Sequence, residues 1–97
     1  HTYVGADGST VRAEVEPALK RYVDTRLYAK SHRSYEDLEE ARLTLFGDAT
    51  GVAQRVKEIE ALGVDHLMVL ANFGALEADK ARATLKRFSA EVLPQVP

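Results

Sequence analysis

The sequence predicts an α/β protein, chiefly from one apolar segment and the pattern that precedes it. Residues 67–71 (Leu-Met-Val-Leu-Ala) are apolar without alternation, as in a strand buried on both faces of a parallel sheet. Before it, apolar residues at helical spacing over 49–62 are followed by Gly63, which favours the left-handed end of a helix. A helix, a strand, a turn and another helix in succession are typical of α/β folds. We therefore predict a buried strand of the parallel type at 65–71.

The remaining elements are mainly helical. Apolar residues recur at helical spacing in four stretches, which predicts helices near 9–30, 35–45, 49–62 and 76–92. The step Phe46-Gly47 is expected to end the second of these helices. Residues 1–4 are compatible with a second, shorter strand.

Residues that favour helix starts precede three of these stretches. Ser9 or Thr10 is expected to cap the first helix, Ser34 the second and Asp48 the third. Pro17 lacks the amide hydrogen of a helical hydrogen bond, so we expect either a kink there or a main helix that begins at Pro17.

Length and composition exclude several classes of protein. The 97 residues correspond to one domain, and the absence of cysteine excludes a disulfide scaffold, a zinc finger and thiol catalysis. A formal charge of −2 does not favour a nucleic-acid-binding protein, which would need a basic recognition surface. No apolar run is long enough to span a bilayer, so we expect no membrane partner and a cytoplasmic location.

The predicted strands do not make a complete sheet. A strand that is apolar on both faces needs a neighbouring strand on each edge, and the segment 1–4 supplies at most one. The chain is therefore expected either to oligomerise through residues 65–71 or to belong to a larger sheet.

Several phrases resemble the C-terminal end of the luciferase-like flavin-dependent monooxygenases. They are Phe46-Gly47-Asp48, Leu62-Gly63-Val64-Asp65-His66-Leu67, Asn72-Phe73-Gly74 and Val92-Leu93-Pro94, in that order. The opening His1-Thr2-Tyr3-Val4-Gly5, with Glu16-Pro17-Ala18-Leu19, resembles members of this family that act in secondary metabolism. The chain departs from the family at Ala49, where a proline is frequent.

This resemblance implies that residues 1–97 are a single partial domain, the last quarter of a (β/α)8 TIM barrel. The family uses a reduced flavin, FMN or a deazaflavin, to oxygenate or oxidise a small organic substrate. Its catalytic residues lie largely on earlier strands, so no catalytic residue is assigned to this chain. We expect the isolated chain to be inactive and to be completed by the rest of the barrel or by a second copy. The flavin is expected in the complete enzyme, and the isolated chain need not bind it.

The resemblance also directs attention to the carboxyl ends of the predicted strands, where barrel enzymes build their active sites. His1, Asn72, Phe73 and Gly74 are therefore candidate residues of a flavin or substrate pocket. Asn72 offers an amide, Phe73 a flat apolar surface and Gly74 room for close backbone approach. A turn between a strand and a helix, with Phe73 in the core, is the competing interpretation.

The other histidines and the basic residues give weaker indications. His66 lies at the start of the predicted strand, the end far from the active face, and His32 lies in a basic linker. The histidines have no metal-ligand spacing. The basic and aromatic residues around Arg21 and Tyr22 are expected to form a solvated helix face. A non-catalytic helical dimerisation or binding module remains the alternative function, with residues 67–71 pairing between two copies.

Overall fold

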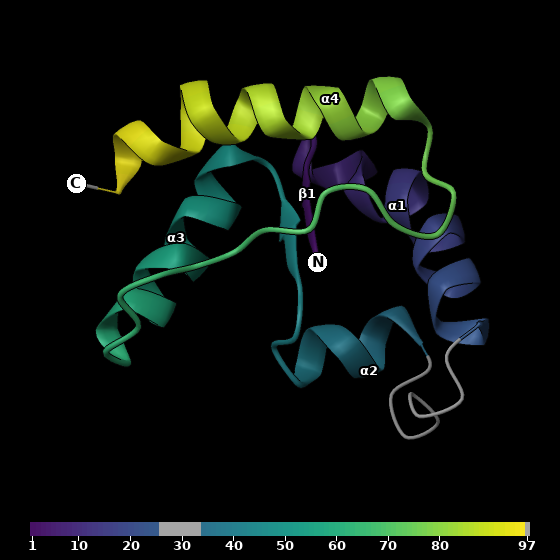
Figure 1. Ribbon diagram of the computed structural model, residues 1–97, viewed down its shortest axis with the longest axis horizontal. Helices are drawn as coiled ribbons and strands as arrows, with labels where there is room; N and C mark the ends of the chain where they lie inside the picture. Colours follow the sequence, from purple (N-terminus) through teal and green to yellow (C-terminus); the bar gives the residue numbers. More distant parts are fainter. Residues whose placement is uncertain (26–33, 97) are drawn as a thin grey trace.

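The computed structural model describes residues 1–25 and 34–96, and its architecture is helix-rich α/β (Figure 1). Two short strands, β1 (Thr2–Val4) and β2 (Leu45–Gly47), form a parallel sheet in which Tyr3 is paired with Phe46. The four α-helices are α1 (Gly8–Asp24), α2 (Tyr35–Glu40), α3 (Ala49–Ala61) and α4 (Ala78–Arg87). The chain continues from α4 through a π-helical turn at Phe88–Val92 and a 3₁₀ turn at Leu93–Gln95. The α/β class and the strand predicted at 1–4 are confirmed.

Helices cover both faces of this small sheet. Tyr3 and Phe46 point toward α1 and belong to one buried cluster with Val15 and Leu19. Val4 and Leu45, which alternate with them along the strands, belong to a second cluster with Val52 of α3 and Val92 beyond α4. Figure 1 shows α1 and α3 on opposite sides of the strands. The two clusters and the sheet between them form a layered α/β arrangement.

The strand predicted at 65–71 is wrong. These residues are extended but lie outside the sheet, and Leu67 and Met68 are 41% and 96% exposed. One backbone hydrogen bond joins the segment to the sheet, from the Thr2 amide to the Leu70 carbonyl at 2.9 Å. Farther along the same edge of β1, the Thr84 and Arg87 side chains of α4 form hydrogen bonds with the backbone of Val4. The apolar sequence therefore remains largely exposed.

The second helix is shorter than predicted, and Phe46-Gly47 does not end it. Helix α2 stops at Glu40, and Arg42 reverses the chain with a φ of 57°. Leu45 and Phe46 then face the two different clusters, which is the alternation of a strand and not the spacing of a helix. The expected helix over 35–45 is therefore wrong at its C-terminal end.

The capping predictions are confirmed in part. Ser34 and Asp37 form a reciprocal capping box at the start of α2, and the Asp48 side chain accepts a hydrogen bond from the Gly51 amide at the start of α3. Asp7, and not Ser9 or Thr10, caps α1 by accepting from the Ser9 amide.

Helix α1 contains Pro17 in its interior, so a main helix that begins at Pro17 is wrong. The helix ends at Asp24, and the rest of the stretch predicted over 9–30 lies largely outside the described residues. The helices predicted at 49–62 and 76–92 are present.

Candidate functional site

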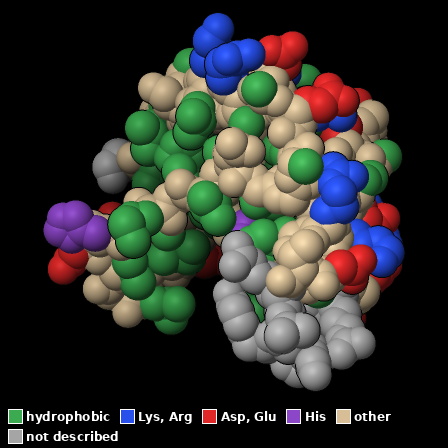
Figure 2. All heavy atoms as spheres, turned by 45° about the vertical axis from the view of Figure 1, so that its right-hand side comes forward, with side chains coloured by type: hydrophobic (Ala, Val, Ile, Leu, Met, Phe, Trp, Pro, Cys, Tyr) green, Lys and Arg blue, Asp and Glu red, His purple; other side chains and the backbone are tan. Residues whose placement is uncertain are grey.

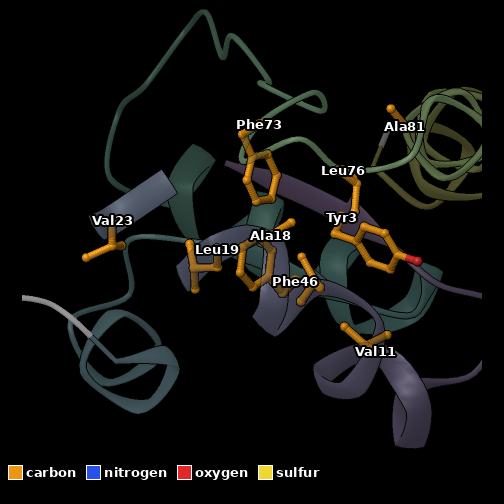
Figure 3. Packing of buried hydrophobic residues seen from close by; sticks show 10 residues of the cluster. Tyr3, Val11, Ala18, Leu19, Val23, Phe46, Phe73, Leu76 and Ala81 are labelled. Atoms are coloured by element: carbon orange, nitrogen blue, oxygen red, sulfur yellow. The ribbon is translucent and has the colours of Figure 1, made fainter. Parts of the chain in front are cut away.

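Aromatic rings gather where the segment after residue 71 meets α1 and the sheet. We call His1, Tyr22, Phe46 and Phe73 the aromatic cluster. The His1 ring lies edge-on to Tyr22 and to Phe73, with ring centres 4.2 and 4.9 Å apart. Phe73 is stacked on Phe46 at 5.9 Å with the rings 9° from parallel, and Figure 3 shows these two residues in the core. Edge-to-face and offset stacked rings at these distances are favourable pairs.

His1 brings a polar group into this apolar surrounding. Its Nε2 atom is buried and has no hydrogen-bond partner among the described residues. Burying a ring nitrogen without a hydrogen-bond partner costs free energy. A donor or an acceptor from a ligand or another segment would remove this cost by pairing with Nε2. His1 is thus the predicted residue with unused hydrogen-bonding capacity in the cluster.

Phe73 and Asn72 have different surroundings. Phe73 is 5% exposed and packs with the core residues of α1, as the competing interpretation expected. Asn72 is exposed and lies next to it in the chain. The structure therefore joins His1 to Phe73 through their rings, while the Asn72 side chain is left at the surface.

Gly74 makes a close backbone approach, but to α1. Its φ is +56°, and a β-carbon at this position would lie 1.7 Å from the Ala18 carbonyl oxygen. The Arg21 Nε atom donates a hydrogen bond of 2.6 Å to the Gly74 carbonyl. The glycine thus fixes the turn against the helix and places it beside the aromatic cluster.

An open hollow of about 470 Å³ adjoins this turn. Its lining residues are Arg21, Tyr22, Asp24, Thr25, Gly74 and Ala75. The hollow offers the edge of an aromatic ring, a guanidinium group and a carboxylate within one concave surface, which suits a planar ligand with polar substituents. Of the four predicted site residues, Gly74 lines the hollow and Asn72 does not. His1 and Phe73 do not line it either, but their rings contact Tyr22, which does.

Arg21 and Tyr22 line the hollow but were not among the predicted pocket residues, because the basic and aromatic residues around them were expected to form a solvated helix face. Tyr22 does have a sequence signal, since it lies one residue before the buried Val23 and three after the buried Leu19. Arg21 has none, because its contact with Gly74 joins residues 53 positions apart.

Tyr3 connects β1 to α1 through its hydroxyl group. Its hydroxyl donates a hydrogen bond of 2.7 Å to the Glu14 carboxylate on α1. Burial, and then the interaction with Glu14, raise the pKa of Tyr3 well above its ordinary value. The neutral phenol therefore ties β1 to α1 at the opposite end of the cluster from His1.

In the part of the chain that the structure describes, no three His, Asp or Glu side chains gather in a way that could hold a metal ion. His66 is exposed, and His32 lies outside the described residues. No helix among the described residues combines the length and apolarity needed to cross a bilayer.

Neither a protein-family model, nor a curated protein, nor a solved structure matches this chain.

Proposed function

We propose that the chain is the C-terminal part of a luciferase-like flavin-dependent monooxygenase. The proposal rests on the order of residue phrases from His1-Thr2-Tyr3-Val4-Gly5 to Val92-Leu93-Pro94. The parallel strands β1 and β2, with α1 and α2 between them in the chain, are consistent with a piece of a (β/α)8 barrel. The complete enzyme would use reduced FMN or a deazaflavin to oxygenate or oxidise a small organic substrate.

The observation that carries this proposal is the exposed apolar segment beside a sheet of two strands. Leu67, Met68 and Leu70 are 41%, 96% and 47% exposed although their sequence is that of a buried strand. Figure 2 shows hydrophobic side chains gathered toward the left of one face, with Lys and Arg at its top and right. An apolar surface of this kind is typical of an interface. In this proposal the other strands of the barrel, or a second copy, cover it.

His1, Asn72, Phe73 and Gly74 are proposed to contribute to the wall of the flavin or substrate pocket. The contact of the His1 and Phe73 rings supports a shared wall, and the exposed amide of Asn72 supports a polar contact at its rim. The unused Nε2 of His1 would bind a polar edge of the ligand. None of these residues is proposed to be catalytic.

The alternative function is a non-catalytic dimerisation or binding module. The same exposed side chains favour it, together with Leu62, which is 83% exposed at the end of α3. Two copies would then bury this surface against each other, without flavin. Sedimentation of the chain over a range of concentrations, with and without FMN, distinguishes the two functions, because the alternative requires a dimer that FMN leaves unchanged.

The proposed function is tested by flavin titration of the natural polypeptide that contains these residues. Asn72→Ala removes an exposed amide at the proposed pocket rim, and Gln54→Ala removes an exposed amide on α3 as a matched control. We expect Asn72→Ala to weaken binding of FMN or a deazaflavin severalfold and Gln54→Ala to leave it unchanged. Absence of flavin binding by the folded, unaltered polypeptide would overturn the proposal.

A further inference from the structure

Two side chains of α4 occupy the outer edge of β1. The Val4 amide donates a hydrogen bond of 3.3 Å to the Thr84 hydroxyl oxygen, and Arg87 Nη1 donates one of 3.1 Å to the Val4 carbonyl. Thr84 is completely buried, and it lies 80 positions after Val4 in the sequence. The amide and carbonyl groups at a sheet edge ordinarily pair with a neighbouring strand. Here two side chains of α4 form the hydrogen bonds of the Val4 amide and carbonyl in place of a strand. We call Thr84 and Arg87 the edge plug.

The segment 66–71 reaches the same edge at Leu70 and does not pair along it. The Leu70 carbonyl already accepts a hydrogen bond of 2.9 Å from the Thr2 amide. Thr2 lies two residues before Val4 on the same strand. Leu67 and Leu70 are about half exposed, and Val69 packs on the cluster that contains Val4. The segment thus has one sheet-like hydrogen bond, an apolar sequence suited to burial, and no access to the polar groups of Val4.

We propose that the edge plug competes with residues 66–71 of the same chain for the outer edge of β1. When Thr84 and Arg87 withdraw, this segment adds to β1 as a third strand. The exchange replaces two side-chain hydrogen bonds by backbone ones and buries apolar side chains that are now exposed, while α4 loses its contact with the strand. The two arrangements therefore have comparable numbers of hydrogen bonds, and the plug residues decide between them.

This inference does not rest on the proposed function. It uses only the contacts at the outer edge of β1, where the Thr2 amide meets the Leu70 carbonyl and the backbone groups of Val4 meet Thr84 and Arg87.

The test is amide hydrogen exchange of the full chain, read by mass spectrometry for residues 66–71. Thr84→Val with Arg87→Met removes the plug but keeps the size of both side chains, and the Val4 amide then lacks a partner until a strand supplies one. We expect exchange over 66–71 to slow by about tenfold or more. The matched control is Thr50→Val with Arg82→Met, which alters an exposed threonine on α3 and an exposed arginine on α4. It should leave exchange over 66–71 unchanged.

Unchanged or faster exchange over 66–71 in the folded double variant would overturn the inference. Protection of 66–71 that becomes stronger as the protein concentration rises would also overturn it, because the pairing strand would then come from a second copy. If the double variant does not fold, Arg87→Met alone provides the test, since the Thr84 contact is kept. In that variant we expect about threefold slower exchange, and no change would again contradict the inference.

Discussion

The carbonyl oxygen of Ala18 lies where the β-carbon of any residue other than glycine at position 74 would have to be. The separation would be 1.7 Å, far below a van der Waals contact, and the obstacle is helix backbone that cannot rotate away. This contact locks the turn after Phe73 onto α1 and thereby fixes the aromatic cluster.

Gly74→Ala should therefore be strongly destabilising. The β-carbon meets the backbone of α1, and the residue must also keep a φ of +56°. We expect a loss of at least about 2 kcal/mol in the free energy of unfolding by urea. Gly63→Ala is the control, since Gly63 has a φ of +90° with nothing within 4 Å of an added β-carbon. It should lose about 1 kcal/mol. Equal losses in the two variants would show that the contact with Ala18 is unimportant.

Tyr3 should make the protein less stable in alkaline solution. Burial, with a smaller effect of Glu14, raises its pKa in the folded state, so the fold favours the neutral phenol. This contribution is fully present below the unfolded pKa of about 10 and is lost as the pH rises above it toward the folded value. Burial raises the pKa of Tyr35 as well and adds to the same trend.

The measurement is the free energy of unfolding between pH 8 and pH 11 for the unaltered chain and for Tyr3→Phe. The variant should be less stable at pH 8 by about 1 kcal/mol, because it lacks the hydrogen bond to Glu14. It should also lose less stability as the pH rises. A pH dependence identical to that of the unaltered chain would contradict the assignment to Tyr3.

Asp48 should stabilise α3 through its side chain. The carboxylate accepts the Gly51 amide at 2.8 Å, which satisfies a donor that has no partner within the helix. Asp48→Ala should cost about 1 kcal/mol in thermal or urea unfolding, whereas Asp48→Asn keeps the acceptor and should cost much less. If both variants lose the same stability, the carboxylate acts by its charge and not as a cap.

Arg12 should hold α2 on α1. Its guanidinium contacts Glu16 and Glu36 and lies 5.0 Å from the centre of the Tyr35 ring, while no residue of α2 is fully buried. Arg12→Met should accelerate amide exchange in α2 without affecting α3, and added salt should act in the same direction in the unaltered chain. Arg82→Met, which breaks the exposed pair with Asp79, is the control. Equal exchange in α2 for both variants would refute this role.

The acid dependence of α2 follows from Glu36. A backbone hydrogen bond, and then the contact with Arg12, lower the pKa of Glu36 in the folded state. Its contribution is present above the unfolded pKa of about 4.3 and is lost as the pH falls through the lower folded value.

Local patterns explain what could be predicted from the sequence. The caps at Ser34 and Asp48 and the left-handed Gly63 depend on residues within a few positions of one another, and all were predicted. The strand at 1–4 was also predicted. These features need no knowledge of tertiary packing.

Long-range contacts explain what could not be predicted. Residues 66–71 have the composition of a buried strand, but the backbone groups of Val4 at the sheet edge are hydrogen-bonded to Thr84 and Arg87, which lie on a helix later in the chain. Similarly, the glycine at position 74 was predicted to allow close approach, but its neighbour, Ala18, is 56 positions away. The barrel order and the flavin pocket belong to this same class of long-range property and stay predictions.

The most direct test of the proposed monooxygenase is a mass spectrum of the natural protein, captured from its source cells through this segment and then denatured. The proposal predicts a larger polypeptide, or a second one in complex, that carries the rest of the barrel and releases FMN or a deazaflavin. A single polypeptide near 10.7 kDa that releases no flavin would contradict it and favour the dimerisation or binding module.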